Sequence, residues 1–207
     1  MISGLRIEGL ALARGERTLL QGLSFSLVSG EAVALTGVNG VGKTTLLRAV
    51  AGFVRPAAGT IRFEEDAAEA PADEARADAM HLLGHADGLK PGRTARQELA
   101  FAARWTGAAD SGLATAVAAL ELEPLLDLQV RKLSAGQRRR VAFARLVAAP
   151  RPIWLLDEPL APLDSRRRAL TAELMTRHLA QGGMILAAVH DPLPIAARIL
   201  ELEGAAR

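Results

Sequence analysis

Residues 37–44 read Gly-Val-Asn-Gly-Val-Gly-Lys-Thr and match the pattern G-x-x-x-x-G-K-[ST] at every fixed position. Glycines lack a Cβ, so the backbone can curl until successive N–H groups point inward at an anion. The pattern predicts that Lys43 reaches the β- and γ-phosphates of a nucleotide and that the Thr44 hydroxyl binds Mg²⁺. An apolar run precedes the loop and residues 45–50 open a helix behind it, which aims the helix N-terminus at the anion. These flanks argue against a glycine-rich turn that matches by chance.

Two adjacent carboxylates, Asp157 and Glu158, follow the apolar residues 153–156. A run without alternation is typical of a parallel strand buried on both faces, and ligands of open α/β sheets bind at the carboxyl ends of such strands. Asp157 could hold Mg²⁺ there, and Glu158 could polarise the water that attacks the γ-phosphate. The alternative interpretation is an ordinary Asp-Glu-Pro turn, which the upstream phosphate loop outweighs.

The segment Ser134-Ala-Gly-Gln137 precedes an arginine-rich helix predicted at residues 138–148. Ser134 and Gln137 have the S-x-x-Q spacing of a capping box. A helix N-terminus with a hydroxyl and a glycine is also a good γ-phosphate site, and both interpretations stay open. The arginine clusters 138–140 and 166–168 are interpreted as solvated helix faces, with a minor role for some of these arginines at a subunit interface. A nucleic-acid patch would interleave aromatic residues, which make up only 3% of the chain.

The remaining segments alternate between strand-like and helix-like patterns. Glycines 107 and 112 are expected to break the long helical region, and Gly182 with Gly183 to close the last helix. The expected elements are short strands within residues 5–28, strands at 59–63 and 184–189, a solvated loop or short helix at 64–78, helical structure at 94–128 and a helix at 165–180. This order predicts an α/β core with an inserted α-helical subdomain.

Composition narrows the possible classes of protein. A chain of 207 residues suits one domain, perhaps with a subdomain, and is too short for two nucleotide-binding domains in tandem. Lys and Arg number 25 against 23 for Asp and Glu, a balance that argues against nucleic acid as the main partner. The absence of cysteine excludes disulfides, thiolate metal sites and cysteine nucleophiles. Neither a signal peptide nor an apolar run of about 20 residues is visible, so if the protein works at a membrane, something else must hold it there.

Taken together, these motifs resemble the nucleotide-binding subunits of ABC transporters in order and spacing, over nearly the whole chain. The motifs are the phosphate loop, Leu-Ser-Ala-Gly-Gln at 133–137, Asp-Glu-Pro at 157–159, Ala-Pro-Leu-Asp at 161–164 and His190. The Leu-Ser-x-Gly-Gln element is the most specific, because other phosphate-loop ATPases and GTPases lack it. The resemblance implies an α/β fold with a P-loop NTPase core, an antiparallel β subdomain and an inserted α-helical subdomain. Residues 1–207 would form a single nucleotide-binding domain, with the helical subdomain at about 90–132.

The resemblance also implies roles for individual residues in a head-to-tail homodimer that holds two ATP molecules between its subunits. Thr44 and Asp157 would serve Mg²⁺, Glu158 would be the catalytic base, and His190 would contact the γ-phosphate as a switch residue. Lys43 would act in catalysis as well as binding. One subunit would bind ATP through Gly37, Val38, Asn39, Gly40, Val41, Gly42, Lys43, Thr44 and Thr45, and the other through Ser134, Gly136 and Gln137, with Asp164 coupling the two sites.

Within that superfamily the closer likeness is to the ATP-binding subunits of the cytochrome c maturation heme exporters. It rests on residues 14–17, 84–91 and 152–159, and on the glycine pair at 182–183. The implied function is ATP hydrolysis that powers heme export or delivery for c-type cytochromes. The implied partners are the multi-span membrane subunits of a cytochrome c maturation complex and a periplasmic heme chaperone. The protein would sit peripherally on the cytoplasmic face of the bacterial inner membrane, without insertion and without nucleic acid.

Alternative functions fit the residues less well. An ABC exporter ATPase for another cargo, such as a lipid or lipoprotein, is the second candidate. Soluble ABC ATPases of DNA repair carry long coiled coils, and those of translation carry tandem domains. Phosphate-loop kinases and GTPases would leave residues 134–137 and His190 unexplained.

Two positions depart from the ABC pattern. Ala86 stands where these subunits usually place a glutamine that senses Mg²⁺ and contacts the membrane partner. Either the alignment is off by a residue or two, or coupling is weakened, or water substitutes for the amide. The aromatic residue that commonly stacks on adenine is also missing, and Arg14 stands about where it is expected. A guanidinium can stack on a base by its flat face, so adenine selectivity is the property in question.

Overall fold

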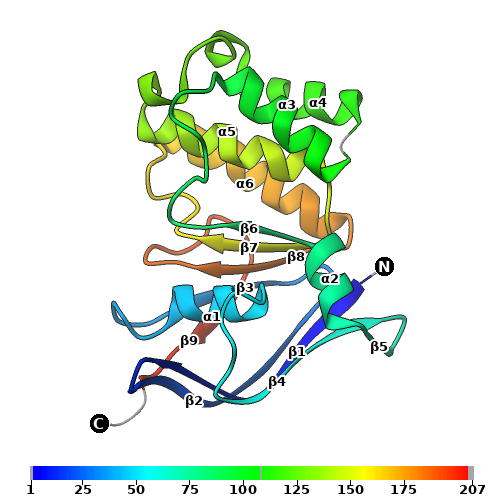
Figure 1. Ribbon diagram of the computed structural model, residues 1–207, viewed down its shortest axis with the longest axis vertical. Coiled ribbons are helices and arrows are strands. Elements are labelled where there is room, and N and C mark those ends of the chain that lie inside the picture. Colours follow the sequence, from blue (N-terminus) through cyan, green and yellow to red (C-terminus); the bar gives the residue numbers. More distant parts are fainter. Residues whose placement is uncertain (1, 108, 205–207) are drawn as a thin grey trace. The chain divides into compact units, whose positions relative to one another are not determined.

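The computed structural model describes residues 2–107 and 109–204 and contains two β-sheets and a set of helices (Figure 1). The described chain divides into two compact units. The first comprises residues 2–82, 151–158 and 176–204, and the second comprises 83–107, 109–150 and 159–175. The assignment of the whole chain to one nucleotide-binding domain, with a helical subdomain at about 90–132, stays a prediction.

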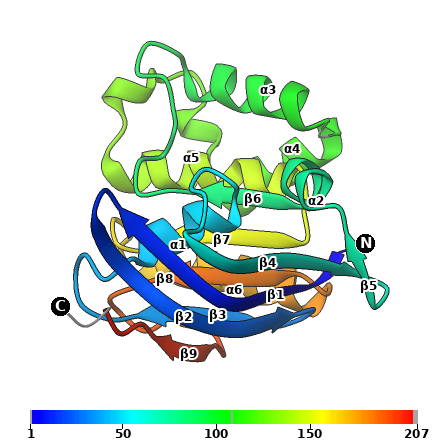
Figure 2. The ribbon, with the colours of Figure 1, turned by 60° about the horizontal axis from the view of Figure 1, so that its bottom comes forward.

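An antiparallel sheet in the first unit has the order β2-β1-β4-β5, and its strands lie in front in Figure 2. Its strands are β1 (Ile2–Arg14), β2 (Arg17–Val28), β4 (Ala58–Glu65) and β5 (Ala68–Ala70). The prediction of several short strands within residues 5–28 is wrong, because β1 and β2 form one long hairpin. The pairing continues past Gly9 and Gly22, which take positive φ near shifts of register, so these glycines form irregularities within the strands.

The other sheet has the order β6-β7-β8-β3-β9. Its strands are β3 (Ala32–Thr36), β6 (Met80–Leu83), β7 (Ile153–Asp157), β8 (Met184–Ala188) and β9 (Arg198–Glu201). β3 pairs in parallel with both β8 and β9, and β7 pairs in parallel with β8. The buried parallel strands expected at 153–156 and 184–189 are therefore confirmed. β6 and β9 lie at the edges, are only four residues long, and lack the apolar run that marks the central strands.

One hydrophobic core fills the first unit. Helix α1 (Lys43–Val50) contributes Leu46, Leu47 and Val50, all fully buried, and lies between the two sheets (Figure 1). Burying each such side chain contributes roughly 1.5–3 kcal/mol, so the helix behind the glycine loop is firmly held. The segment expected to be a loop or short helix, residues 64–78, contains the end of β4, β5 and helix α2 (Ala72–Asp78).

The second unit is helical. It contains α3 (Ala95–Thr106), α4 (Asp110–Ala119), the 3₁₀ turns η1 (Glu123–Leu125) and η2 (Val130–Lys132), α5 (Ala135–Ala148) and the first part of α6 (Ser165–Ala180). Gly107 ends α3 with φ +69°, as a left-handed cap. Gly112 does not break the helical region as expected, because it lies inside α4. A Cβ there would come within 2.4 Å of the Ala148 carbonyl oxygen, so glycine permits the close contact with α5.

Candidate functional site

The glycine loop joins β3 to α1 in the first unit. Gly37, Gly40 and Gly42 have φ of +126°, +79° and +125°, values that side chains with a Cβ rarely adopt. A Cβ on Gly37 would lie 2.6 Å from the Leu202 carbonyl oxygen, and one on Gly42 would lie 3.2 Å from Cγ of Leu20. The loop therefore requires glycine both for its backbone conformation and for close packing.

Lys43 begins α1 and is 8% exposed. Its ammonium donates a hydrogen bond of 2.6 Å to the Gly37 carbonyl oxygen, so the side chain folds back over the loop that it follows. This places a cation inside the curl of backbone where phosphate oxygens would lie. The arrangement fits a polyphosphate, since an anionic oxygen is a stronger acceptor for an ammonium than a neutral carbonyl.

Thr44 and Asp157 meet between the start of α1 and the end of β7. The Thr44 hydroxyl lies 3.1 and 3.0 Å from the two carboxylate oxygens of Asp157, which is 4% exposed. A hydroxyl and a carboxylate side by side are hard oxygen donors of the kind Mg²⁺ takes together with phosphates and water. Among residues 2–107 and 109–204, no three His, Cys, Asp or Glu side chains gather as a metal cage. The donor set fits a metal that arrives with its nucleotide.

Glu158 follows Asp157 and adopts a left-handed backbone with φ +48°. Its amide donates a 2.9 Å hydrogen bond to the Ala188 carbonyl oxygen at the end of β8. The Glu158 carboxylate lies 3.5 Å from Nε2 of His190, and the two side chains are 20% and 54% exposed. A non-glycine residue in this conformation costs about 1–3 kcal/mol and persists where the surroundings hold it, as functional sites commonly do.

The first unit thus brings together the side chains predicted to bind phosphate, metal, attacking water and γ-phosphate: Lys43, Thr44, Asp157, Glu158 and His190. Of the rest of the predicted loop, Val38 is 74% exposed while Val41 is buried against the core. The individual roles stay predictions.

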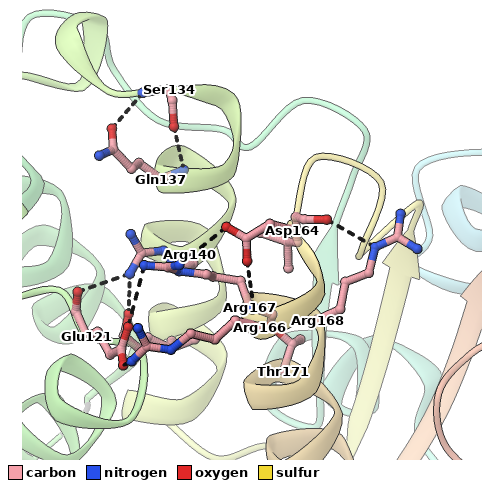
Figure 3. Close-up of polar contacts among 11 residues, drawn as sticks. Glu121, Ser134, Gln137, Arg140, Asp164, Arg166, Arg167, Arg168 and Thr171 are labelled. Atoms are coloured by element: carbon pink, nitrogen blue, oxygen red, sulfur yellow. Dashed lines mark hydrogen bonds and ion pairs between the residues drawn. The ribbon is translucent and has the colours of Figure 1, made fainter.

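Ser134 begins α5 in the second unit. Its hydroxyl accepts a 3.2 Å hydrogen bond from the Gln137 amide, and the Gln137 side-chain oxygen accepts one of 2.8 Å from the Ser134 amide (Figure 3). The capping-box prediction is confirmed. The helix start opens into a pocket of 440 Å³, lined by Ser134, Ala135, Gly136, Gln137, Arg140, Pro162, Leu163, Asp164 and Arg167. The cap and a γ-phosphate site at the same helix start remain compatible, because the cap uses the Ser134 hydroxyl as an acceptor and a hydroxyl can also donate.

The wall of this pocket opposite the helix start is the segment 162–164. A Cβ on Gly136 would lie 2.7 Å from the Pro162 carbonyl oxygen, so glycine lets the segment approach the helix. Asp164 caps α6 by accepting a 2.9 Å hydrogen bond from the Arg167 amide, and its other oxygen lies 3.3 Å from the Arg167 guanidinium. The predicted residues Ser134, Gly136, Gln137 and Asp164 are therefore neighbours in one pocket.

The prediction that residues 138–140 form a solvated face is wrong for two arginines of α5, which are buried. Arg139 is 3% exposed and Arg140 is 7% exposed. Arg139 donates to the carbonyl oxygens of Gly84 and His85, each at 3.0 Å. Burial lowers the pKa of Arg140 below its ordinary value. Helical spacing contained a usable signal, because Arg139 shares one face with Ala142, Phe143 and Leu146, which are buried.

Arginines of α5 also hold the loop that contains Ala86. Arg145 donates to the carbonyl oxygens of Asp87 and Gly88, and the Asp87 carboxylate lies 3.2 Å from Nε of Arg139. Ala86 itself is exposed and offers no amide at the position expected for glutamine. Arg14, expected near the adenine, is exposed at the end of β1.

Comparisons with known proteins agree with this geometry. Residues 20–161 match the family model described as ABC transporter. The cytochrome c biogenesis ATP-binding export protein CcmA of Rhodopseudomonas palustris (strain BisB5) is 46% identical over 199 residues, covering 96% of this chain and 98% of the relative. An ABC transporter ATP-binding protein from Pyrococcus furiosus has a similar structure, with a TM-score of 0.83, 21% identity and coverage of 97% and 98% of the two chains. A dimeric bacterial ABC transporter cassette gives a TM-score of 0.82 at 23% identity, with coverage of 96% and 94%. The last two show the fold alone, which is the predicted α/β P-loop fold with an antiparallel sheet and a helical insertion.

Proposed function

We propose that this chain hydrolyses ATP to drive a membrane transporter for c-type cytochrome maturation. The chain belongs to the ABC transporter family, and within it to the CcmA cytochrome c biogenesis ATP-binding export proteins. The observation that carries the proposal is the grouping of Lys43, Thr44, Asp157, Glu158 and His190 around the glycine loop. A binding module without catalysis would need the loop but not the base. The Glu158–His190 pair is what favours hydrolysis.

Nucleotide binding begins with an exchange of partners at Lys43. Its ammonium leaves the Gly37 carbonyl, 2.6 Å away, for the oxygens of the β- and γ-phosphates. Thr44 and Asp157 would hold Mg²⁺, which when bound neutralises charge that develops on the phosphates. Both groups are already within 3.1 Å of each other, so little reorganisation is needed.

Glu158 then acts on water. Its carboxylate accepts a proton from the water molecule that attacks the γ-phosphorus, and the bond to the bridging oxygen breaks to release ADP and phosphate. His190 lies 3.5 Å from that carboxylate, close enough to contact both Glu158 and a γ-phosphate beside it. The hydrogen bond from the Glu158 amide to the Ala188 carbonyl oxygen holds this strained backbone, and with it the carboxylate, at the strand end.

The pocket at the start of α5 supplies a second set of γ-phosphate contacts. It would act in a head-to-tail homodimer, in which Ser134, Gly136 and Gln137 of one subunit meet the nucleotide held by the other. The unsatisfied amides at the helix start favour an anion. ATP then binds the closed dimer more tightly than the open one, because only the closed form offers both sets of contacts. That difference in affinity is what can drive a conformational change.

Membrane attachment falls to partner subunits. Within the described part of the chain, no helix combines the length and apolar character needed to cross a bilayer. Multi-span subunits of a cytochrome c maturation complex would hold the protein peripherally on the cytoplasmic face of the inner membrane. The cargo or delivered group would be heme, handed to a periplasmic chaperone.

Two substitutions test the enzymatic part. Lys43→Ala should remove most ATP turnover, while Lys90→Ala, which deletes an exposed lysine outside the loop, should not. Glu158→Gln should bind ATP, hydrolyse it slowly and accumulate as a dimer in gel filtration with ATP and Mg²⁺. Normal hydrolysis by Lys43→Ala would refute the site, and a Glu158→Gln chain that stays monomeric would refute the composite dimer.

The cargo is tested in cells that lack the chain. Heme-stained c-type cytochromes should disappear and return with the wild-type chain but not with Glu158→Gln. Purification from native membranes should recover multi-span partners of the maturation complex. Intact cytochromes together with mislocalised lipoproteins would instead support an exporter of another cargo.

A further inference from the structure

Glu121 occupies a backbone position that suits glycine. It follows α4 with φ +51°, and the Leu122 amide bonds to the Val117 carbonyl oxygen at 3.0 Å while the Glu121 amide bonds to that of Ala118 at 3.2 Å. This is the hydrogen-bond pattern of a Schellman motif, whose left-handed residue is usually glycine. A glutamate here carries a conformational cost, which a favourable interaction of its side chain can offset.

The Glu121 carboxylate, 35% exposed, faces two arginines of α6. One oxygen forms an ion pair with Arg166, and the other lies 3.7 Å from the guanidinium of Arg167 (Figure 3). Arg166 is the hydrogen-bonded partner of Glu121, whereas Arg167 contacts a second carboxylate, that of Asp164, at 3.3 Å.

Arg167 therefore stands between two carboxylates. It and Asp164 both line the pocket at the start of α5, while Glu121 lies behind them. With Glu121 in place the guanidinium has a carboxylate on each side, at 3.7 and 3.3 Å, and this pair of contacts favours one orientation. Without Glu121 the guanidinium would keep its contact with Asp164, an exposed residue, and the two side chains could move together.

The backbone of Glu121 is fixed independently of its side chain. Arg140, 7% exposed, donates to the carbonyl oxygens of Leu120 and Glu121 at 2.8 and 3.0 Å. Arg140 also lines the pocket. The left-handed turn is thus anchored at the pocket wall, and a carboxylate projecting from it has a defined position.

We propose that Glu121 is a positioning residue for the ATP site shared by two chains: it orients Arg167, and through Arg167 the carboxylate of Asp164, toward the partner subunit. This inference rests on the proposed function, because Asp164 has a partner to face only in the composite dimer. Glu121 itself touches no nucleotide in this arrangement.

The experiment uses the full-length Glu158→Gln chain as the parent and measures its ATP-dependent dimerisation with Mg²⁺ by analytical ultracentrifugation. Glu121→Gln should weaken the dimer by about tenfold, the size of a typical coupling between groups in one polar network. Arg96→Gln is the matched control, since it removes one arginine of an exposed ion pair, with Asp127, in the same unit and outside the pocket, and it should dimerise like the parent. Arg167→Gln should weaken the dimer, and adding Glu121→Gln to it should weaken it no further.

A separate variant excludes a merely structural role. Glu121→Gly suits the left-handed position and should melt at or above the parent's temperature, yet dimerise as weakly as Glu121→Gln. Parent-like dimerisation of Glu121→Gln would overturn the inference alone, and additive effects with Arg167→Gln would overturn the route through Arg167. A parent that stays monomeric with ATP would overturn the composite site and this role together.

Discussion

Replacing Gly136 by alanine would place a methyl group against the segment that carries Asp164. The added Cβ would lie 2.7 Å from the Pro162 carbonyl oxygen, about 0.7 Å closer than an ordinary contact at 3.4 Å. Gly136 lies in the first turn of α5 and its φ is not positive, so alanine meets no backbone strain there. The contact with residue 162 is therefore the only obstacle.

The size of the effect on stability and turnover follows from the distance, about 0.7 Å, by which this contact would be too short. Alanine is favoured over glycine in a helix by about 1 kcal/mol, whereas overpacking costs roughly 1–3 kcal/mol, so the net loss of stability should be about 0–2 kcal/mol. Relief by displacement would move the 162–164 segment by about 0.7 Å. A misplacement of about 1 Å can cost two orders of magnitude in rate, so ATP turnover should fall about tenfold or more.

Gly112→Ala is the matched control. Its Cβ would lie 2.4 Å from the Ala148 carbonyl oxygen, a tighter contact in the same unit that involves no pocket residue. This variant should lose more stability in urea denaturation but keep its turnover per folded molecule. The reasoning is refuted if Gly136→Ala hydrolyses ATP at the wild-type rate, or if Gly112→Ala loses as much turnover per folded molecule.

Three further predictions concern other positions. His178 stacks on Trp154 with ring centroids 4.0 Å apart. Burial lowers the pKa of His178 below its ordinary 6.5, so the imidazole takes up a proton less readily in the native chain than in the unfolded chain. The free energy of unfolding should therefore fall as the pH drops below about 6.5, and His178→Phe should flatten that slope in chemical denaturation at several pH values; an unchanged slope would contradict it. Thr44→Val removes the hydroxyl beside Asp157 and should raise the Mg²⁺ concentration for half-maximal ATPase activity by roughly tenfold or more, with an unaltered Mg²⁺ requirement as the contrary result. Ala86→Gln restores an amide at an exposed loop position and should increase the stimulation of ATPase activity by membrane partners, measured against the wild-type chain in native membranes.

The phosphate loop and the strands around it could be predicted because their signals are local. Residues 37–44 combine glycines with a lysine at fixed spacing, and the apolar runs that became β3, β7 and β8 lack alternation. The capping box of Ser134 and Gln137 is equally local, since both partners lie within one helical turn. Such features depend on neighbouring residues, so they can be recognised without the tertiary structure.

Other assignments needed the partner residues. Gly112 was predicted to break the helix, but it lies inside one, and a glycine is needed there because the carbonyl oxygen of Ala148 on another helix leaves no room for a Cβ. Glu121 gave no signal at all, because a left-handed glutamate is recognised only when its backbone angle and the two α6 arginines are known. Arg139 and Arg140 were predicted to be surface charges, but they are buried because backbone carbonyl oxygens of segments distant in the chain accept their hydrogen bonds.

The sequence by itself determined the chemistry of the site: a lysine in a glycine loop, a hydroxyl, paired carboxylates and a histidine in a fixed order. Only the tertiary structure decided which of these side chains touch, as with Glu158 and His190, which are far apart in the chain and 3.5 Å apart in space. The physical reason is that spacing along a chain specifies helical turns and strand faces within a few residues. Contacts between distant segments arise only when sheet order, strand register and packed helices bring them together.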